Sequence, residues 1–436
     1  MLNVRWCFFF ESSLDFLNPK ELNMGIGKLK NKIWPLVLVA ISVVLIYLAF
    51  FRKEGNTSEY VAVKPIVHSS GSQFASSESC MACHEDLYLN TSHTAHFHSS
   101  AKATPKTIKG SFEEGFNSII IDEKYRFTIG IDQGTAYQKA IALPNDEPVL
   151  RKSIDMVIGS GQKGQTYGHW QRSDLFQLPL SYYAPTKEWT ESPGVPFQPL
   201  TGLRKINAKC LECHTTFAKS NSLYGIGNSY EKERILYGIK CQRCHGPAKA
   251  HVDHHLKHPE ATEPFGIISV ASLPQTRRMD LCALCHSGFR TDLQAPFEYI
   301  VGEDLSEYST ADYRDNLEQN WDVHGNQVAL LEASACFKNS IHMDCMSCHD
   351  PHQDQRGKSA DFNVKCVACH TKDFSNLHVN NKATISKTSD CISCHMPVQP
   401  SKAMSIPLSD STSIPVQVRT HLIGVYIDQL NSVVED

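Results

Sequence analysis

The chain has 436 residues, of which 41% are hydrophobic, and this is enough to build two or three domains. It carries 42 lysine and arginine residues against 46 aspartate and glutamate residues, so the formal net charge is −4 at pH 7. This near balance gives no indication of nucleic-acid binding or of a strongly acidic substrate, because both favour a large basic excess.

The chain opens with a segment, residues 1–32, that we expect to lie on the cytoplasmic side of a membrane. Residues 1–23 do not resemble a targeting region. The sequence from Met24, MGIGKLKNKIW, carries the basic residues that precede a membrane-directed apolar run. We therefore interpret Met24 as the true start and residues 1–23 as a mis-assigned extension.

An apolar run follows at residues 33–51, IWPLVLVAISVVLIYLAFF, and contains no charged residue. A run of this length can span a bilayer as a helix. A cleaved signal peptide has a shorter apolar region that ends in small residues, whereas this run ends in bulky ones. We expect an uncleaved transmembrane anchor at 33–51, followed by a polar, serine-rich tether at 52–79.

The pentapeptide C-x-x-C-H occurs seven times after the tether and uses fourteen of the sixteen cysteines. It is typical of covalent c-type haem attachment, in which the two thiols bond to the porphyrin and the histidine is the proximal iron ligand. Zinc sites and redox-active thiol pairs also use C-x-x-C, but they do not require a histidine after every second cysteine. We therefore expect seven covalently bound c-type haems, attached at Cys80, Cys83 and His84; Cys210, Cys213 and His214; Cys241, Cys244 and His245; Cys282, Cys285 and His286; Cys345, Cys348 and His349; Cys366, Cys369 and His370; and Cys391, Cys394 and His395.

The motifs divide the rest of the chain into three segments. Residues 80–105 carry the first motif, residues 106–200 carry none, and residues 201–436 carry the other six. We predict a first haem region, a β-rich insertion without haem, and a six-haem domain of short helices and loops. The expected fold class is α+β: a loop-rich multihaem cytochrome c with stacked haems, a small antiparallel β segment and an N-terminal transmembrane helix.

The insertion has the composition of strands. Runs rich in β-branched and aromatic residues at Phe116–Asp122, Tyr125–Ile131 and Thr135–Ile141 are separated by turn residues. The later glycine loop GSGQKGQT has Gln165 where a phosphate-binding loop requires lysine. We therefore expect an antiparallel sheet with a glycine hairpin, and no nucleotide site.

The number of histidines determines which iron coordination we expect. Seven of the 21 histidines are proximal, so the other fourteen could provide a second axial histidine to every haem. A histidine that follows a motif closely is expected to reach a neighbouring haem, since the proximal face of its own haem is filled. The candidate distal iron ligands are His96, His251, His324, His342, His352 and His421, with His93 as the alternative to His96, and His378 and His169 as further candidates.

The remaining histidines, the methionines and the lone cysteine near the motifs fit structural roles. His254, His255 and His258 fit a solvated helix face as well as a ligand role. His68 in the tether and His98 are expected to ligate nothing. Methionine is the usual alternative axial ligand, but the available methionines fit packing roles equally well, and the lone Cys336 fits a buried structural position; these methionines are Met343, Met346, Met396 and Met404.

Four segments resemble the multihaem cytochromes c related to hydroxylamine oxidoreductase and to the small tetrahaem cytochromes of nitrification: CHEDLYLNTSHTAHF, CQRCHGPAKAHV, CMSCHDPH and CISCHMP. The resemblance implies stacked and perpendicular haem pairs. It also implies distal ligands at His251, a few residues beyond CHGP, and at His93 or His96. The chain departs from these relatives in having seven motifs, none with lysine in place of histidine, so the resemblance does not imply their catalytic activity.

These features together predict electron transfer. Covalent c-type haem is attached outside the bacterial inner membrane, so the soluble part is expected in the periplasm, held at the membrane by the N-terminal helix. It would carry electrons between quinol-side donors and periplasmic or extracellular acceptors, with redox proteins at the membrane as partners. The alternative is an oxidoreductase that acts on a small nitrogen or sulfur compound at one open haem. The sequence leaves a homo-oligomer open.

Overall fold

The computed structural model describes residues 39–42, 64–194, 202–312, 321–370, 390–407 and 412–426. The chain divides into two units, Met1–Lys64 and Pro65–Asp436, and the second unit carries all seven motifs. The anchor predicted at 33–51 lies outside the described residues except for 39–42, which are helical. Within the described ranges, no helix is long and apolar enough to cross a membrane.

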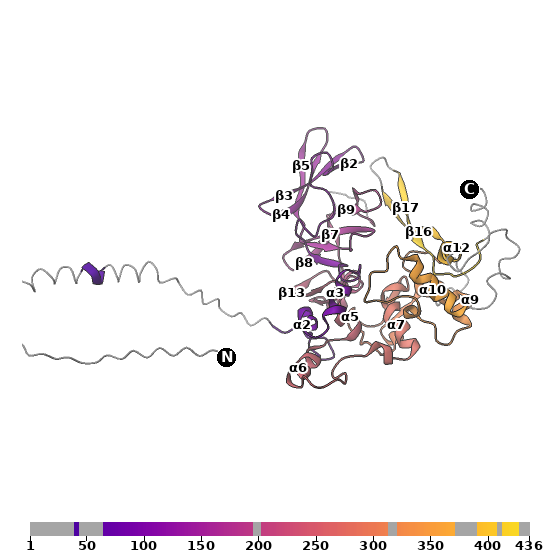
Figure 1. Cartoon of the computed structure of the whole chain (residues 1–436). Coiled ribbons are helices and arrows are strands. Elements are labelled where there is room, and N and C mark those ends of the chain that lie inside the picture. Colours follow the sequence, from indigo (N-terminus) through magenta and orange to yellow (C-terminus); the bar gives the residue numbers. More distant parts are fainter. Residues whose placement is uncertain are drawn as a thin grey trace, which may run out of the picture. The chain divides into compact units, whose positions relative to one another are not determined.

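Antiparallel sheets form the part of the second unit drawn in purple and magenta in Figure 1. Successive hairpins build a four-stranded meander, in which the two-residue turn Gln133-Gly134 has positive φ at both positions, as a tight β-hairpin requires. The three runs predicted from composition coincide with its first three strands, so this prediction is confirmed. The strands are β2 (Ser118–Ile121), β3 (Tyr125–Asp132), β4 (Thr135–Ala142) and β5 (Glu147–Ser153), paired in that order.

A second, seven-stranded sheet makes the β part larger than the sequence indicated. Side chains from both sheets share one core, in which Phe127, Ile129 and Leu180 are fully buried. Its strands pair antiparallel in the order β1-β6-β7-β8-β11, with β9 joined to β7 and β10 to β9. They are β1 (Ser100–Lys102), β6 (Met156–Ile158), β7 (Gly164–Gln171), β8 (Asp174–Gln177), β9 (Leu180–Tyr183), β10 (Glu188–Glu191) and β11 (Arg204–Lys205).

The glycine loop between β6 and β7 is a structural turn. Gly159 and Gly161 both adopt positive φ. The Gln165 side chain points back into the fold, where its Oε1 accepts a hydrogen bond from the Lys109 N–H at 2.9 Å and its Nε2 donates to the Thr107 carbonyl at 3.1 Å. The residue that replaces the phosphate-binding lysine therefore anchors the loop to the preceding segment.

Short helices and hairpins make up the rest of the unit, and the hairpins among the motifs were not predicted. The helices are α2 (Ser77–Met81), α3 (Glu85–Ser92), α4 (Ala208–Glu212), α5 (Cys241–His245), α6 (Lys249–Lys257), α7 (Gln275–His286), α8 (Gln327–Ala333), α9 (Ala335–Lys338), α10 (Ser359–Cys369) and α12 (Cys391–His395), with 3-10 turns η1 (Leu223–Gly225), η2 (Val270–Ser272), η3 (Leu305–Glu307) and η5 (Cys345–Ser347). The hairpins are β12 (Thr215–Ser220) with β13 (Tyr230–Tyr237), β14 (Arg290–Asp292) with β15 (Ser309–Ala311), and β16 (Val398–Pro407) with β17 (Ser413–Arg419).

Two apolar clusters connect these elements to the sheets and to each other. One packs Met156 and Leu175 from the large sheet against Leu211 of α4 and Tyr230 of β13. The other surrounds α7 and includes Leu305 of η3. The first motif region therefore does not stand apart in space: the Ser99 and Ser100 hydroxyls, which follow it, both donate to the His214 carbonyl of the second motif.

Candidate haem centres

Each C-x-x-C-H motif begins in a turn of helix. Six start within α-helices (α2, α4, α5, α7, α10 and α12) and the fifth starts in η5. In a helical turn, side chains three positions apart lie on one face, so both thiols of each motif point the same way. The turn also includes the histidine: the amides of His84, His349 and His370 donate to the carbonyl of the first cysteine of their own motifs at 2.9, 2.9 and 3.0 Å.

Four motif histidines have a second histidine ring opposite them. Three of the pairs are nearly parallel and one is steeply tilted. The ring centroids are 6.3 Å apart with 15° between the planes for His84 and His251, 6.1 Å and 18° for His245 and His352, 6.2 Å and 27° for His349 and His421, and 6.1 Å and 69° for His96 and His286.

This spacing fits an iron ion between each pair. A metal–nitrogen bond to histidine is about 2 Å long and the ring centroid lies about 1.1 Å beyond the nitrogen, so two axial imidazoles on one ion have centroids about 6 Å apart. Rings that packed directly on each other would be closer. The residues present therefore fit haem iron with two axial histidines, and the haem would supply reversible one-electron chemistry at these positions.

Several of these imidazoles are oriented by hydrogen bonds to backbone carbonyls. The Nδ1 atoms of His245, His251 and His395 donate to the carbonyls of Ile268, Phe265 and Gly424 at 2.9, 3.0 and 2.8 Å. A proton held on Nδ1 leaves the lone pair of Nε2 free for a metal. This contact fixes both the tautomer and the plane of the ring.

The surroundings of His96 and His421 keep these two rings neutral. Desolvation, with repulsion from His286 and His349, lowers the pKa of His96 to about 4. Desolvation also lowers the pKa of His421 to about 4, with His349 as the next cause. Neutral imidazole is the form that binds metal, so these two side chains are in the ligating state at neutral pH.

Comparisons with known proteins agree with this geometry. Residues 182–246, which contain the second and third motifs, match the family model for cytochrome c554 and c-prime. The multihaem cytochrome MtrA of Shewanella baltica (strain OS185) is 24% identical over 194 residues, which cover 43% of this chain and 51% of that protein, so the match spans about half of that relative. The crystal structure of the outer cell wall cytochrome OcwA superposes with a TM-score of 0.50 at 16% identity, covering 83% of this chain and 81% of that one. All three likenesses are to c-type cytochromes, and those to MtrA and OcwA cover the larger part of the matched sequence and fold.

The structure separates the candidate distal ligands into two groups. His96, His251, His352 and His421 each lie opposite a motif histidine. The others have no motif histidine ring facing them within the described part of the chain, and their ligand role stays a prediction. Among these, His342 and His93 are exposed, His324 donates its amide to Asp322, His169 forms an ion pair with Asp155 at 3.0 Å, and His378 lies outside the described residues.

His68 differs from its expected place in a loose tether. Only 7% of its surface is exposed, and its ring packs beside those of Phe74 and Phe217, with centroids 6.4 Å from each. Its Nδ1 accepts the Ser70 amide at 3.1 Å. Burial of the ring lowers its pKa. The end of the predicted tether is therefore packed into the fold, next to the first motif.

Hydrogen bonds between motifs show which of them are neighbours. Ala75 lies just before α2. The Gln242 side chain of the third motif accepts a hydrogen bond from the Ala75 amide at 2.8 Å and donates one to the Ala75 carbonyl at 2.9 Å. Arg278 of α7 pairs with Asp344, which caps η5, at 2.5 Å. The amide of Cys391 donates to the Asn363 side chain of α10 at 3.0 Å. These contacts join motif one to three, four to five, and six to seven.

Thiol and ring contacts add the remaining links. The Cys213 thiol interacts with that of Cys285, which raises the pKa of Cys213 and brings motif two beside motif four. His349 of motif five meets Phe362 of α10 with centroids 5.1 Å apart. The Cys244 thiol of motif three interacts with those of Cys282 and Cys285, which links motif three to motif four. The motifs thus follow the spatial order one, three, four, five, six, seven, with motif two beside four, an order that the sequence does not reveal.

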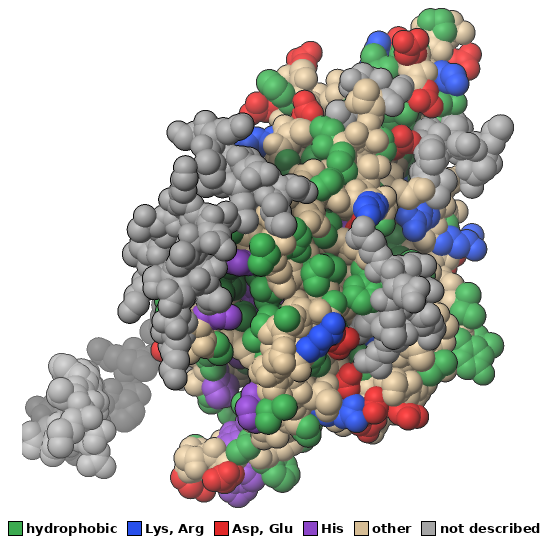
Figure 2. Space-filling view, turned by 90° about the vertical axis from the view of Figure 1, so that its right-hand side faces the viewer, with side chains coloured by type: hydrophobic (Ala, Val, Ile, Leu, Met, Phe, Trp, Pro, Cys, Tyr) green, Lys and Arg blue, Asp and Glu red, His purple; other side chains and the backbone are tan. Residues whose placement is uncertain are grey.

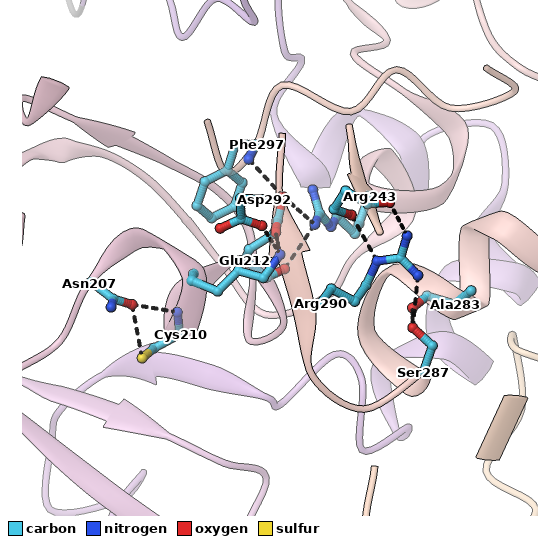
Figure 3. Close-up of polar contacts among 11 residues, drawn as sticks. Asn207, Cys210, Glu212, Arg243, Ala283, Ser287, Arg290, Asp292 and Phe297 are labelled. Carbon is cyan, nitrogen blue, oxygen red and sulfur yellow. Dashed lines mark hydrogen bonds and ion pairs between the residues drawn. The ribbon is translucent and has the colours of Figure 1, made fainter. Parts of the chain in front are cut away.

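A buried charged network lies where motifs two and three meet, and sequence reasoning missed it. Glu212, 3% exposed, accepts hydrogen bonds from Lys209 at 3.1 Å and from the Phe297 amide at 2.8 Å, and its carboxylate lies 3.8 Å from Arg243 (Figure 3). Lys209 also pairs with Asp292 at 2.6 Å. Glu212 and Arg243 occupy variable positions of two C-x-x-C-H motifs. Their opposite charges at these positions were the only sign in the sequence that could have indicated the network.

Proposed function

We propose that the protein is a heptahaem c-type cytochrome whose function is electron transfer. The observation that carries this proposal is the set of four histidine pairs at the spacing of axial iron ligands. Iron with two strong axial ligands has no open position for a substrate, and it changes charge with little rearrangement, which suits a carrier of electrons.

The order of the motifs supports a path for these electrons. The haem of the first motif would sit at one end and that of the seventh at the other, with the third, fourth, fifth and sixth between them. Distal ligands cross from one motif region to another: His251 follows the third motif but faces the first, and His352 follows the fifth but faces the third. Each such crossing links the haems of two different motifs through one short segment of chain.

The setting of this path is part of the proposal. We place the soluble part in the periplasm, with residues 33–51 as its anchor in the bacterial inner membrane. Donors at the quinol side of that membrane and acceptors in the periplasm or beyond would be its partners. The description of OcwA as an outer cell wall cytochrome supports a role at the cell boundary, and that of MtrA as a multihaem cytochrome supports electron transfer.

The spin state of the oxidised, haem-loaded protein tests the proposal. We expect a mass that corresponds to seven haems, electron paramagnetic resonance spectra dominated by low-spin ferric iron, and no carbon monoxide adduct on most haems of the reduced protein. A majority of high-spin haems that bind carbon monoxide would contradict electron transfer as the main function.

One observation favours a second function, the conversion of a small nitrogen or sulfur compound at an open haem. His214, like His370, has no histidine ring opposite it among the described residues, and what distinguishes it is a buried Nδ1 without a hydrogen-bond partner there. The haem of the second motif would then have a free distal position beside motifs three and four, which could supply it with electrons. A single high-spin signal that His214→Ala removes, and that nitrite or hydroxylamine perturbs, would support this function.

A further inference from the structure

Three histidines of α6 and His258, which caps its C-terminus, form a continuous series of rings that begins at the half-buried His251 and ends at the exposed His258. His251 faces His84 with a centroid distance of 6.3 Å. From His251 the centroid distances are 4.5 Å to His255, then 5.1 Å to His254, then 4.9 Å to His258. Figure 2 shows histidine side chains gathered toward the end of the molecule that carries α6. Only the first member of this series is used by the proposed haem.

The outer two rings have the geometry of a metal site. His254 lies in the last turn of α6 and His258 is its C-cap residue, whose amide donates to the His254 carbonyl at 2.9 Å, so the two residues are one helical turn apart. A histidine ring centroid lies about 3 Å from a metal that it binds, so two rings at adjacent positions of one ion are about 4.5–5 Å apart. The observed 4.9 Å meets this requirement.

The surroundings of the pair favour a cation that takes nitrogen ligands. Phe265 stacks on His254 with centroids 4.3 Å apart and 25° between the planes, which restricts the rotation of that ring. A Glu260 carboxylate oxygen lies 3.9 Å from Nδ1 of His258 and adds negative charge. The pair borders an open hollow lined also by Ala250, Asp253, Lys257 and Phe265, so solvent ions reach it.

We propose that His254 and His258 form an exposed binding site for a transition-metal ion, with Cu²⁺ as the preferred occupant. Imidazole suits copper, and among divalent ions of the first row Cu²⁺ binds such ligands most tightly. The proposed site has two protein ligands, and water would complete the coordination of the ion; among the described residues no group of three or more His, Cys, Asp and Glu side chains is arranged to hold a metal.

The series of rings gives this site a role in the proposed electron transfer, on which this part of the inference rests. His255 and His251 connect the site to the haem that we assign to His84. Cu²⁺ bound at the site would accept one electron and become Cu⁺, while one haem iron goes from ferrous to ferric, and no proton is transferred. The site would thus be an acceptor position at the first-motif end of the path.

Copper titration of the untagged, haem-loaded, oxidised full chain tests the site. We expect one Cu²⁺ per chain with a paramagnetic resonance signal from nitrogen ligands, and affinity reduced at least about tenfold in His254→Gln and in His258→Gln. Leu256→Gln is the matched control, because Leu256 lies on the same helix and is 73% exposed. Its affinity should equal that of the unaltered protein. Equal copper affinity in all four proteins would overturn the site.

Rapid mixing of the reduced protein with Cu²⁺ tests the acceptor role. We expect reoxidation of one or more haems that is several-fold slower in His258→Gln than in Leu256→Gln, and no reoxidation with Zn²⁺, which cannot accept an electron. If copper binds but the two variants are reoxidised at one rate, the acceptor role is wrong and the site remains. Failure of the proposed carrier function would be seen separately, as high-spin haem in spectra recorded before any metal is added.

Discussion

The rings of His96 and His286 face each other with centroids 6.1 Å apart, although one follows the first motif and the other belongs to the fourth. The backbone holds His96 in place independently of its side chain, because its carbonyl accepts the amides of Ser99 and Ile239 at 3.0 and 2.8 Å. The ring is therefore positioned by the strand that follows it and by the loop before α5. A long-range contact of this kind fixes which haem receives which ligand.

Replacement of His96 should convert one haem from low spin to high spin. In His96→Ala the iron assigned to His286 loses its second axial nitrogen, while the main-chain contacts of residue 96 are kept. Paramagnetic resonance of the ferric protein would show the new high-spin signal, and mass spectrometry would show an unchanged number of haems.

His93→Ala is the matched control for this experiment. His93 is exposed, ends α3, and was the alternative ligand from the sequence. Its replacement should leave all spin states as they are. The opposite pattern, with a high-spin haem in His93→Ala and none in His96→Ala, would contradict the pairing of His96 with His286.

Replacement of Gln138 should weaken the contact between the two sheets and lower the stability of the protein. Its fully buried side chain on β4 donates to the Leu180 carbonyl of β9 at 2.9 Å and accepts the Leu180 amide at 3.0 Å. Gln138→Met would leave both backbone groups buried without partners, at a cost of about 3 kcal/mol. Denaturant unfolding followed by circular dichroism would measure this change in the free energy of unfolding. Lys139→Met, at the exposed neighbouring position, should change stability by less than about 0.5 kcal/mol, and equal effects of the two changes would contradict the role of Gln138.

The parts of the molecule that sequence could predict are those set by local pattern. C-x-x-C-H spacing is contained within one helical turn, so the multihaem character was visible without a structure. The β-branched and aromatic runs in residues 116–141, with turn residues between them, likewise predicted β2, β3 and β4. Gln138 shows the limit, since a polar residue on the inward face of a strand breaks the pattern and only its partner on β9 explains it.

The remaining features depend on contacts between distant segments. Nothing near His251 in the sequence indicates that it faces His84 rather than another motif histidine, because that choice is made by the packing of α6. The hairpins between the motifs are short and carry few β-branched alternations, so they were missed. The buried pairing of Glu212 with Arg243 could be suspected only from charged residues inside two motifs.

Loss of the Glu212 charge should destabilise the junction of motifs two and three. Glu212→Gln keeps an acceptor for the Phe297 amide but leaves Arg243 without its buried counter-charge, and Nε of Arg243 already lacks a partner. We expect a loss of about 2–3 kcal/mol, less than for a fully isolated pair because Lys209 retains Asp292. A lower denaturant concentration at the unfolding midpoint of the haem-loaded protein would show this loss of stability.

Glu231→Gln serves as the control for that change. Its ion pair with Arg234, at 3.1 Å, is partly exposed, so its removal should cost no more than about 0.5 kcal/mol. A midpoint for Glu212→Gln equal to that of Glu231→Gln would mean that the buried network does not contribute to stability.

Asp155 should make the stability of the β part depend on acid pH. Burial alone would raise its pKa, but hydrogen bonds from His169 and the Trp170 amide outweigh this and hold the pKa below its ordinary value of 3.8. A carboxylate with a lowered pKa contributes stability that is fully present above the unfolded value of 3.8 and is lost as pH falls through the lower folded value. Unfolding measurements should therefore show a steeper loss below pH 3.8 for the unaltered protein than for Asp155→Asn, which cannot titrate there. Parallel pH profiles for the two proteins would rule out this contribution.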